Sequence, residues 1–163
     1  MRFLKLGAII SPLLLLAAQG QSASLEKWPL GPKWPGPHPI PRHNIADQWG
    51  VPAPYKSMTN PPPVTQDTIA RGKMVFGQNC VSCHGSSGLG DGEAAPTLKP
   101  PAGNLAWLSD MPLVKWNAFM YWTIAEGGVQ FGTAMPAFKN TLSKDDIWAV
   151  TAYIQARLPV KPK

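Results

Sequence analysis

The stretch of sequence that decides the fold reads Cys80-Val81-Ser82-Cys83-His84. It contains both cysteines of the 163-residue chain, separated by two residues and followed directly by a histidine. In a short helical turn this spacing places both sulfurs on one side, where each thiol can add to a vinyl group of a haem. The imidazole of His84 can then coordinate the haem iron from below the ring. The pattern predicts one covalently attached haem c.

Two other uses of a Cys-x-x-Cys pair need features that the sequence lacks. A structural zinc site requires four ligands, and the remaining histidines, His38 and His43, lie in a proline-rich stretch far upstream. We expect both of these histidines to be exposed to solvent. A thioredoxin-like dithiol requires a preceding β-strand, whereas the residues before Cys80 have the spacing of a helix. The sequence therefore favours haem attachment.

The beginning of the chain has the pattern of a secretory signal peptide. Arg2 and Lys5 precede a largely apolar run over 6–18, which is too short to cross a bilayer as a helix. Small residues follow this run, and we expect residues 1–24 to be removed on export; an uncleaved membrane anchor is the alternative. Because c-type haem is attached outside the bacterial inner membrane, the sequence predicts a periplasmic protein.

The charge balance is weakly basic. The formal charge of +6 falls to +4 when Arg2 and Lys5 leave with the signal peptide. No run of basic residues interleaved with aromatic ones occurs in the sequence, so its composition does not indicate nucleic-acid binding. A weak positive charge favours docking to an acidic redox partner, where it mainly raises the rate of association.

Residues 25–64 differ in composition from the rest of the chain. They contain 11 prolines and three tryptophans, Trp28, Trp34 and Trp49. Each proline fixes a backbone angle and removes a hydrogen-bond donor, so we expect this segment to be an irregular N-terminal extension. We expect it to attach the chain to a partner protein, with the tryptophans as anchors. The alternative is that it wraps the chain's own haem domain.

Residues 65–163 have the pattern of an all-α domain, because glycine- and proline-containing loops separate helical periods and no alternating strand pattern occurs. We expect the first helix to be capped by Asp67 or Thr68 and to run into the haem motif. Small and apolar residues at helical spacing form one stripe along it: Ile69, Gly72, Phe76 and Cys80.

Two more helices are expected in the second half of this domain. One begins near Pro112 and ends at Gly127, and it should be buried because apolar residues nearly encircle it. The last begins with Ser143 and Asp146 in capping-box spacing and ends before Pro159. Its apolar face is formed by Ile147, Val150, Ile154 and Leu158.

The second axial ligand decides between an electron carrier and a catalyst, because His84 alone leaves the sixth coordination position open. Met135 lies in a glycine-rich loop between two expected helices, and Pro136 would hold the backbone after it. Met111 also precedes a proline but lies at a helix start, and Met120 is expected in a helix core. We therefore predict His84 and Met135 as the iron ligands, with Met111 as the alternative.

Residues 66–160 resemble the class I c-type cytochromes of bacteria. Gly72 and Phe76 match the glycine and the aromatic residue of that family's N-terminal helix, and Val150 and Tyr153 match residues of its C-terminal helix. The glycine permits close approach where the two helices cross, and the aromatic ring fills the crossing. The resemblance implies a class I cytochrome c fold, with helices packed around one haem held by the two cysteines.

The resemblance also implies a proline carbonyl that accepts a hydrogen bond from the free ring nitrogen of His84 and so fixes the ring. Pro96 lies 12 residues after His84, where the family often has this proline. Pro100 and Pro101 lie in a stretch that also looks like the relevant turn, so both positions stay open.

Histidine and methionine ligation predicts a single-electron carrier rather than an enzyme, either soluble or as the cytochrome subunit of a larger oxidoreductase. The composition of residues 25–64 resembles segments of monohaem subunits in membrane respiratory complexes, which implies docking to such a complex. We expect no transmembrane span once the signal peptide is cleaved. A haem enzyme or gas sensor with an open or displaceable distal position is the alternative.

Overall fold

The computed structural model describes residues 42–109 and 112–156, which form helices joined by loops without any β-strand. The predicted signal peptide and the first part of the extension lie outside these residues. The elements are α1 (Arg42–Trp49), η2 (Tyr55–Ser57), α2 (Gln66–Asn79), α3 (Val81–His84), η3 (Ala95–Thr97), α4 (Leu105–Leu108), η4 (Pro112–Lys115), α5 (Asn117–Glu126), η5 (Val129–Phe131) and α6 (Lys144–Gln155). The all-α class predicted from the sequence is confirmed.

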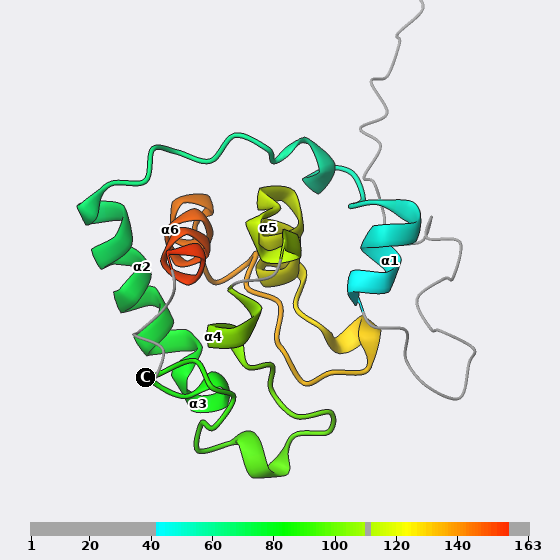
Figure 1. Cartoon of the computed structure of the whole chain (residues 1–163), viewed down its shortest axis with the longest axis vertical. Coiled ribbons are helices and arrows are strands. Elements are labelled where there is room, and N and C mark those ends of the chain that lie inside the picture. Colours follow the sequence, from blue (N-terminus) through cyan, green and yellow to red (C-terminus); the bar gives the residue numbers. More distant parts are fainter. Residues whose placement is uncertain (1–41, 110–111, 157–163) are drawn as a thin grey trace, which may run out of the picture.

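The four longer helices follow one another across Figure 1 in the order α2, α6, α5 and α1. Helix α5 packs against α6 on one side and against η2 on the other, so it lies at the centre of the core. The haem motif in α3 lies at the far end of α2, below these helices in Figure 1. The haem motif therefore lies at one end of the group of longer helices.

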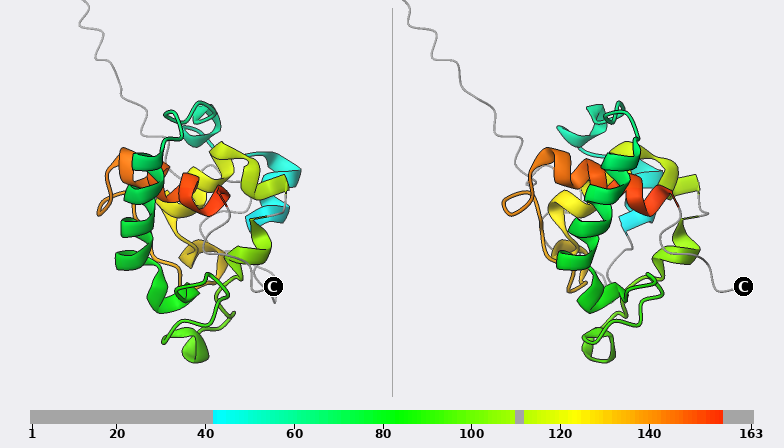
Figure 2. Two further views of the ribbon diagram at one scale, coloured as in Figure 1. Left: turned by 60° about the vertical axis from the view of Figure 1, so that its left-hand side comes forward. Right: turned by 90° about the vertical axis from the view of Figure 1, so that its left-hand side faces the viewer.

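The crossing of α2 and α6 is the most extensive helix contact in the described part of the chain, and Figure 2 shows α2 passing in front of α6. A Cβ atom on Gly72 would overlap the backbone carbonyl of Ala149, so only glycine allows the two helices to approach this closely. Next to it, the rings of Phe76 and Tyr153 meet edge to face at 5.7 Å. The crossing predicted from Gly72 and Phe76 is confirmed.

The predicted cap of the last helix, α6, is confirmed, whereas the predicted cap of α2 is wrong. Ser143 and Asp146 form the predicted capping box at the start of α6. Helix α2 is capped by Thr65, whose side chain accepts a hydrogen bond from the Thr68 amide, so the prediction of Asp67 or Thr68 as the cap is wrong. Thr65 is preferred because it leaves Asp67 inside the first turn, where its charge favours the helix dipole.

The second predicted helix is divided in the structure. Pro112 begins the short 3₁₀ element η4, and α5 starts separately at Asn117. Helix α5 is buried nearly all round, as expected, and it ends at Gly127, whose positive φ of 64° suits only glycine. The single turn α4 between the haem motif and η4 was not predicted, because four residues give no readable period.

The prediction of an irregular extension is wrong for residues 42–49 and 55–57, which are helical, whereas residues 58–64 form no helix. Helix α1 fills a stretch of ten residues between Pro41 and Pro52 that contains no proline, and Gly50 ends it with a φ of 79°. Buried side chains from this segment join the main core: Ile45, Ala46, Val51 and Tyr55. The alternative that the extension wraps its own haem domain therefore holds for this part. Residues 25–41, with Trp28 and Trp34, lie outside the described residues.

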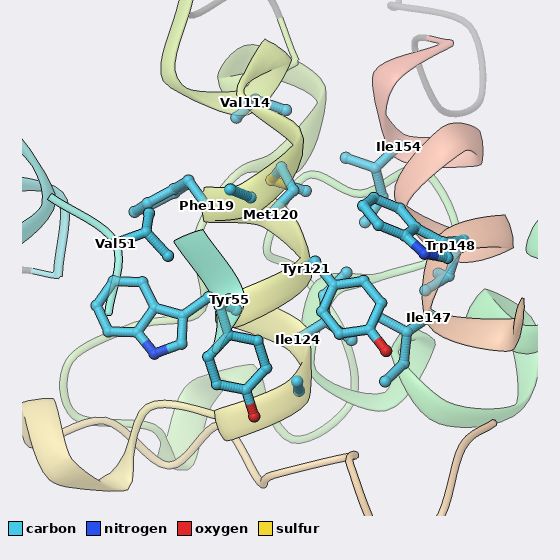
Figure 3. Close-up of a cluster of buried hydrophobic side chains, with 14 of the residues drawn as sticks. Val51, Tyr55, Val114, Phe119, Met120, Tyr121, Ile124, Ile147, Trp148 and Ile154 are labelled. Atoms are coloured by element: carbon cyan, nitrogen blue, oxygen red, sulfur yellow. The ribbon is translucent and has the colours of Figure 1, made fainter. Parts of the chain in front are cut away.

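Figure 3 shows how the core joins the extension to the C-terminal helix. Val51 and Tyr55 lie on one side of α5, and Ile147 and Trp148 of α6 lie on the other. The ring of Tyr121 on α5 points toward Trp148, with ring centroids 4.6 Å apart. Helix α5 therefore links both ends of the described chain. None of the helices in the described ranges has the length and hydrophobicity needed to cross a membrane.

Candidate haem site

The two cysteines lie at the junction of α2 and α3. Cys80 ends α2, and the amides of Cys83 and His84 both donate to the Cys80 carbonyl at 3.2 and 2.9 Å, which closes a helical turn. This turn brings both cysteines and His84 to the wall of one cavity. Burial, and after it the neighbouring Cys83, raises the pKa of the Cys80 thiol to about 11. Both thiols are free, so both are available to form thioether bonds.

His84 is held by a backbone carbonyl on its far side. Its Nδ1 atom lies 2.9 Å from the carbonyl oxygen of Gly103, so in the tautomer that donates there, Nε2 carries the free lone pair. Burial of the ring lowers its pKa, and the bond to Gly103 opposes this effect only in part. The neutral imidazole is the form that binds iron.

The carbonyl that orients His84 is not the one predicted. Pro96 lies in η3 and makes no such contact, and neither Pro100 nor Pro101 supplies the acceptor. Gly103 takes this place because the loop after His84 folds back on α3. The Gly90 amide donates to the His84 carbonyl at 2.9 Å, and the Leu105 amide donates to the Gly88 carbonyl at 2.6 Å. These bonds fold the loop so that Gly103, 19 residues after His84, lies next to the ring, and the spacing from His84 alone does not reveal this.

Met135 lies in a loop that two glycines fold tightly. The Gly128 amide donates to the Met135 carbonyl at 2.8 Å, and the Thr133 amide donates to the Gly128 carbonyl at 3.1 Å. A Cβ on Gly127 would overlap the backbone of Pro136, and one on Gly128 would overlap the Thr133 hydroxyl. Gly127 is therefore required for its φ and its contact with the Pro136 backbone, and Gly128 allows Thr133 and Met135 to pack closely against it.

His84 and Met135 lie 51 residues apart in the sequence and line the same space. A cavity of about 700 Å³ is bordered by both residues and by apolar side chains of α4, α5 and α6. A smaller cavity continues from it past both cysteines and is again lined by His84 and Met135. The volume lies within the usual range for cofactor cavities. Two thiols and an imidazole are the groups that a covalently bound haem requires, and a thioether is one of the groups that can occupy its sixth coordination position.

Unlike Met135, the other methionines and histidines considered for the sixth coordination position line at most one of the two cavities or lie outside the described residues. Met120 on α5 is buried and lines only the larger cavity, and Met74 is exposed at 62%. His43 is exposed, as predicted, although it borders the larger cavity. Met111 and His38 lie outside the described residues. Within the described ranges, no group of three or more His, Cys, Asp or Glu residues is arranged to hold a metal ion, so the zinc interpretation gains no further ligands.

The loop that carries Met135 is tied to the extension through Glu126. The Tyr55 hydroxyl donates to the Glu126 carboxylate, and Lys139 forms an ion pair with the same group at 2.9 Å. Burial of the Tyr55 ring, together with this hydrogen bond, raises the pKa of Tyr55 well above its usual value. The carboxylate lies at the end of α5, so it joins η2, α5 and the segment after Met135. No motif or period in the sequence indicates this connection, because Tyr55 and Glu126 lie 71 residues apart.

The chain matches both a family model of a cytochrome c oxidase subunit and a known c-type cytochrome. Residues 67–154, more than half of the chain, match the family model described as cytochrome c oxidase, cbb3-type, subunit III. Cytochrome c6 from Anabaena variabilis is 34% identical over 83 residues, which cover 51% of this chain and 84% of that protein.

A solved structure has a similar fold. It is a chain of the reducing HAO-like protein complex of Kuenenia stuttgartiensis, with a TM-score of 0.51 and 25% identity. The similarity covers 71% of this chain and 55% of that chain, so this protein spans about half of its structural neighbour.

Proposed function

Since the chain belongs to the family of cbb3-type cytochrome c oxidase subunit III, we propose that it carries single electrons with His84 and Met135 as iron ligands. It is a class I monohaem c-type cytochrome with one covalent haem c. The observation that carries the ligand proposal is that His84 and Met135, 51 residues apart in the sequence, line the same two cavities.

The residues around the cavity suit rapid electron transfer. When bound, the haem iron supplies a one-electron couple. The hydrogen bond from His84 to Gly103 fixes the imidazole and increases its basicity. The glycine-folded loop holds the Met135 thioether, which favours the reduced state and raises the potential. The apolar side chains of α4, α5 and α6 exclude water and act in the same direction.

We propose that the protein works in the periplasm and docks to a larger redox complex. The N-terminal pattern of residues 1–24 supports export. A structural neighbour belongs to a protein complex, which supports a role as a subunit. Residues 42–58 pack on the chain's own core, so residues 25–41, with Trp28 and Trp34, are the part of the extension proposed for attachment.

The absorption spectrum of the purified holoprotein tests the ligation. We expect a low-spin ferric spectrum with the weak far-red band typical of iron bound to a thioether, and a ferrous form that does not take up carbon monoxide. High-spin bands with rapid carbon monoxide binding would instead support a haem enzyme or gas sensor with an open distal position.

A further inference from the structure

Arg42, the first residue of α1, has a buried guanidinium with an unusual set of contacts. It lies over the rings of Phe131 and Trp122, at 4.7 and 5.2 Å from their centroids. Its Nη1 atom donates to the Thr123 carbonyl at 3.4 Å. The Nε and Nη2 atoms are buried and have no hydrogen-bond partner among the described residues. A buried cation with unpaired donors is costly unless an anion completes the site.

The two unpaired donors point to the kind of anion. The Nε and Nη2 hydrogens lie on the same edge of a guanidinium, and this edge forms two parallel hydrogen bonds with a carboxylate. Nη1 lies on the other edge and is already occupied by Thr123. The free edge therefore has the geometry for one carboxylate.

No protein carboxylate in the described ranges fills this role. Glu126 is close enough to act on Arg42 electrostatically, but its oxygens are bound by Tyr55 and Lys139, and no ion pair joins it to Arg42. Asp47 borders the same cavity without forming an ion pair with Arg42. Burial lowers the pKa of Arg42 to about 10, which still leaves it charged at neutral pH.

Arg42 also lines the large cavity together with His84 and Met135. The haem that this cavity accommodates carries two propionates, so a carboxylate enters the cavity with the cofactor. We propose that Arg42 binds one haem propionate through Nε and Nη2, which makes helix α1 of the N-terminal extension part of the haem site. This inference rests on the covalent haem and holds whichever residue is the sixth ligand.

Replacing the guanidinium should change how the reduction potential depends on pH. A cation bound to the propionate lowers the pKa of that carboxyl, so the wild-type propionate stays ionised well into the acid range. In Arg42→Gln the propionate should titrate about 1 to 3 pH units higher. The reduction potential falls with rising pH over the range in which the propionate ionises, so this range should move upward by the same amount.

The test compares holoproteins of wild type, Arg42→Gln, Arg42→Lys and Lys56→Gln by spectroelectrochemical titration across the pH range. Besides Arg42, the titratable groups facing this region among the described residues are His43, Asp47, Tyr55, His84, Glu126 and Lys139. Lys56→Gln is the matched control, because it removes one positive charge from an exposed position of the same extension that does not line the cavity, and we expect it to leave the acid-range inflection in place. Arg42→Lys keeps the charge and should shift the inflection less than Arg42→Gln. A profile of Arg42→Gln that superimposes on wild type would overturn the proposal.

A second measurement needs no variant, in case Arg42→Gln does not fold. In ¹⁵N-labelled ferrous holoprotein, the Arg42 Nε–H should exchange slowly with solvent and show nuclear Overhauser effects to the propionate methylenes. Slow exchange and these nuclear Overhauser effects are both expected from a guanidinium bound to the propionate. If the Arg42 signal contacts only the rings of Phe131 and Trp122, the guanidinium is a structural packing element and the proposal is wrong.

Discussion

Gly72→Ala tests the close packing of α2 against α6. An added Cβ would lie 2.7 Å from both the carbonyl carbon of Ala149 and the Cβ of Tyr153, where ordinary contacts are 3.4–4 Å. Helices α2 and α6 would therefore have to separate by about 1 Å along their most extensive contact. Overpacking of this kind costs about 1 to 3 kcal/mol of unfolding free energy. For a domain of this size, the melting temperature would fall by on the order of 5 to 20 °C.

Gly77→Ala is the matched control, because Gly77 lies in the same helix and a Cβ there would meet no atom within 4 Å. Alanine at an exposed helical position stabilises by about 0.5 to 1 kcal/mol relative to glycine. Thermal and denaturant unfolding of the two ferric holoproteins should therefore give changes of opposite sign. If Gly72→Ala were as stable as Gly77→Ala, the close approach of α2 and α6 would be wrong.

Two further predictions concern polar contacts. Tyr55→Phe should lower the unfolding free energy by about 1.5 to 3 kcal/mol, because it removes a hydrogen bond to the charged Glu126. Unchanged denaturant unfolding would refute a stabilising role for this hydrogen bond. The Ser143 side chain, and after it Arg71, lowers the pKa of Asp146 in the folded state, so its contribution is present above the ordinary aspartate pKa and lost as pH falls through the lowered value. Asp146→Asn should therefore be less stable than wild type at neutral pH, with a difference that closes in acid; a constant difference would contradict this.

The covalent site could be predicted from a local motif, and the crossing from the family resemblance that Gly72 and Phe76 carry. Gly72 and Phe76 share a stripe on one helix, and the capping box at Ser143 spans four residues. The haem motif fits into a single turn. In each case the residues that carry the signal lie within a few positions of one another, so a period or a spacing records them, even though the partners of Gly72 and Phe76 lie on α6.

The features that were missed depend on contacts between distant parts of the chain. Helix α1 is hidden in the sequence by the high proline content of residues 25–64 as a whole, although no proline interrupts residues 42–51. The carbonyl of Gly103 reaches His84 only after the intervening loop folds back. Arg42 bonds to Thr123 across 81 positions, and no sequence period contains such a pair. These contacts are set by tertiary packing rather than by local preference.

The most direct test of the account is nuclear magnetic resonance of the ferrous holoprotein with Met135→Leu and Met120→Leu variants. A methionine bound to haem iron lies directly above the ring, so its methyl resonance moves far upfield. Leucine keeps a similar volume at either position, which limits effects on packing. We predict that the upfield methionine signal is present in wild type and in Met120→Leu and is lost in Met135→Leu. Its survival in Met135→Leu, or its loss in Met120→Leu alone, would contradict the assignment of Met135 as the axial ligand.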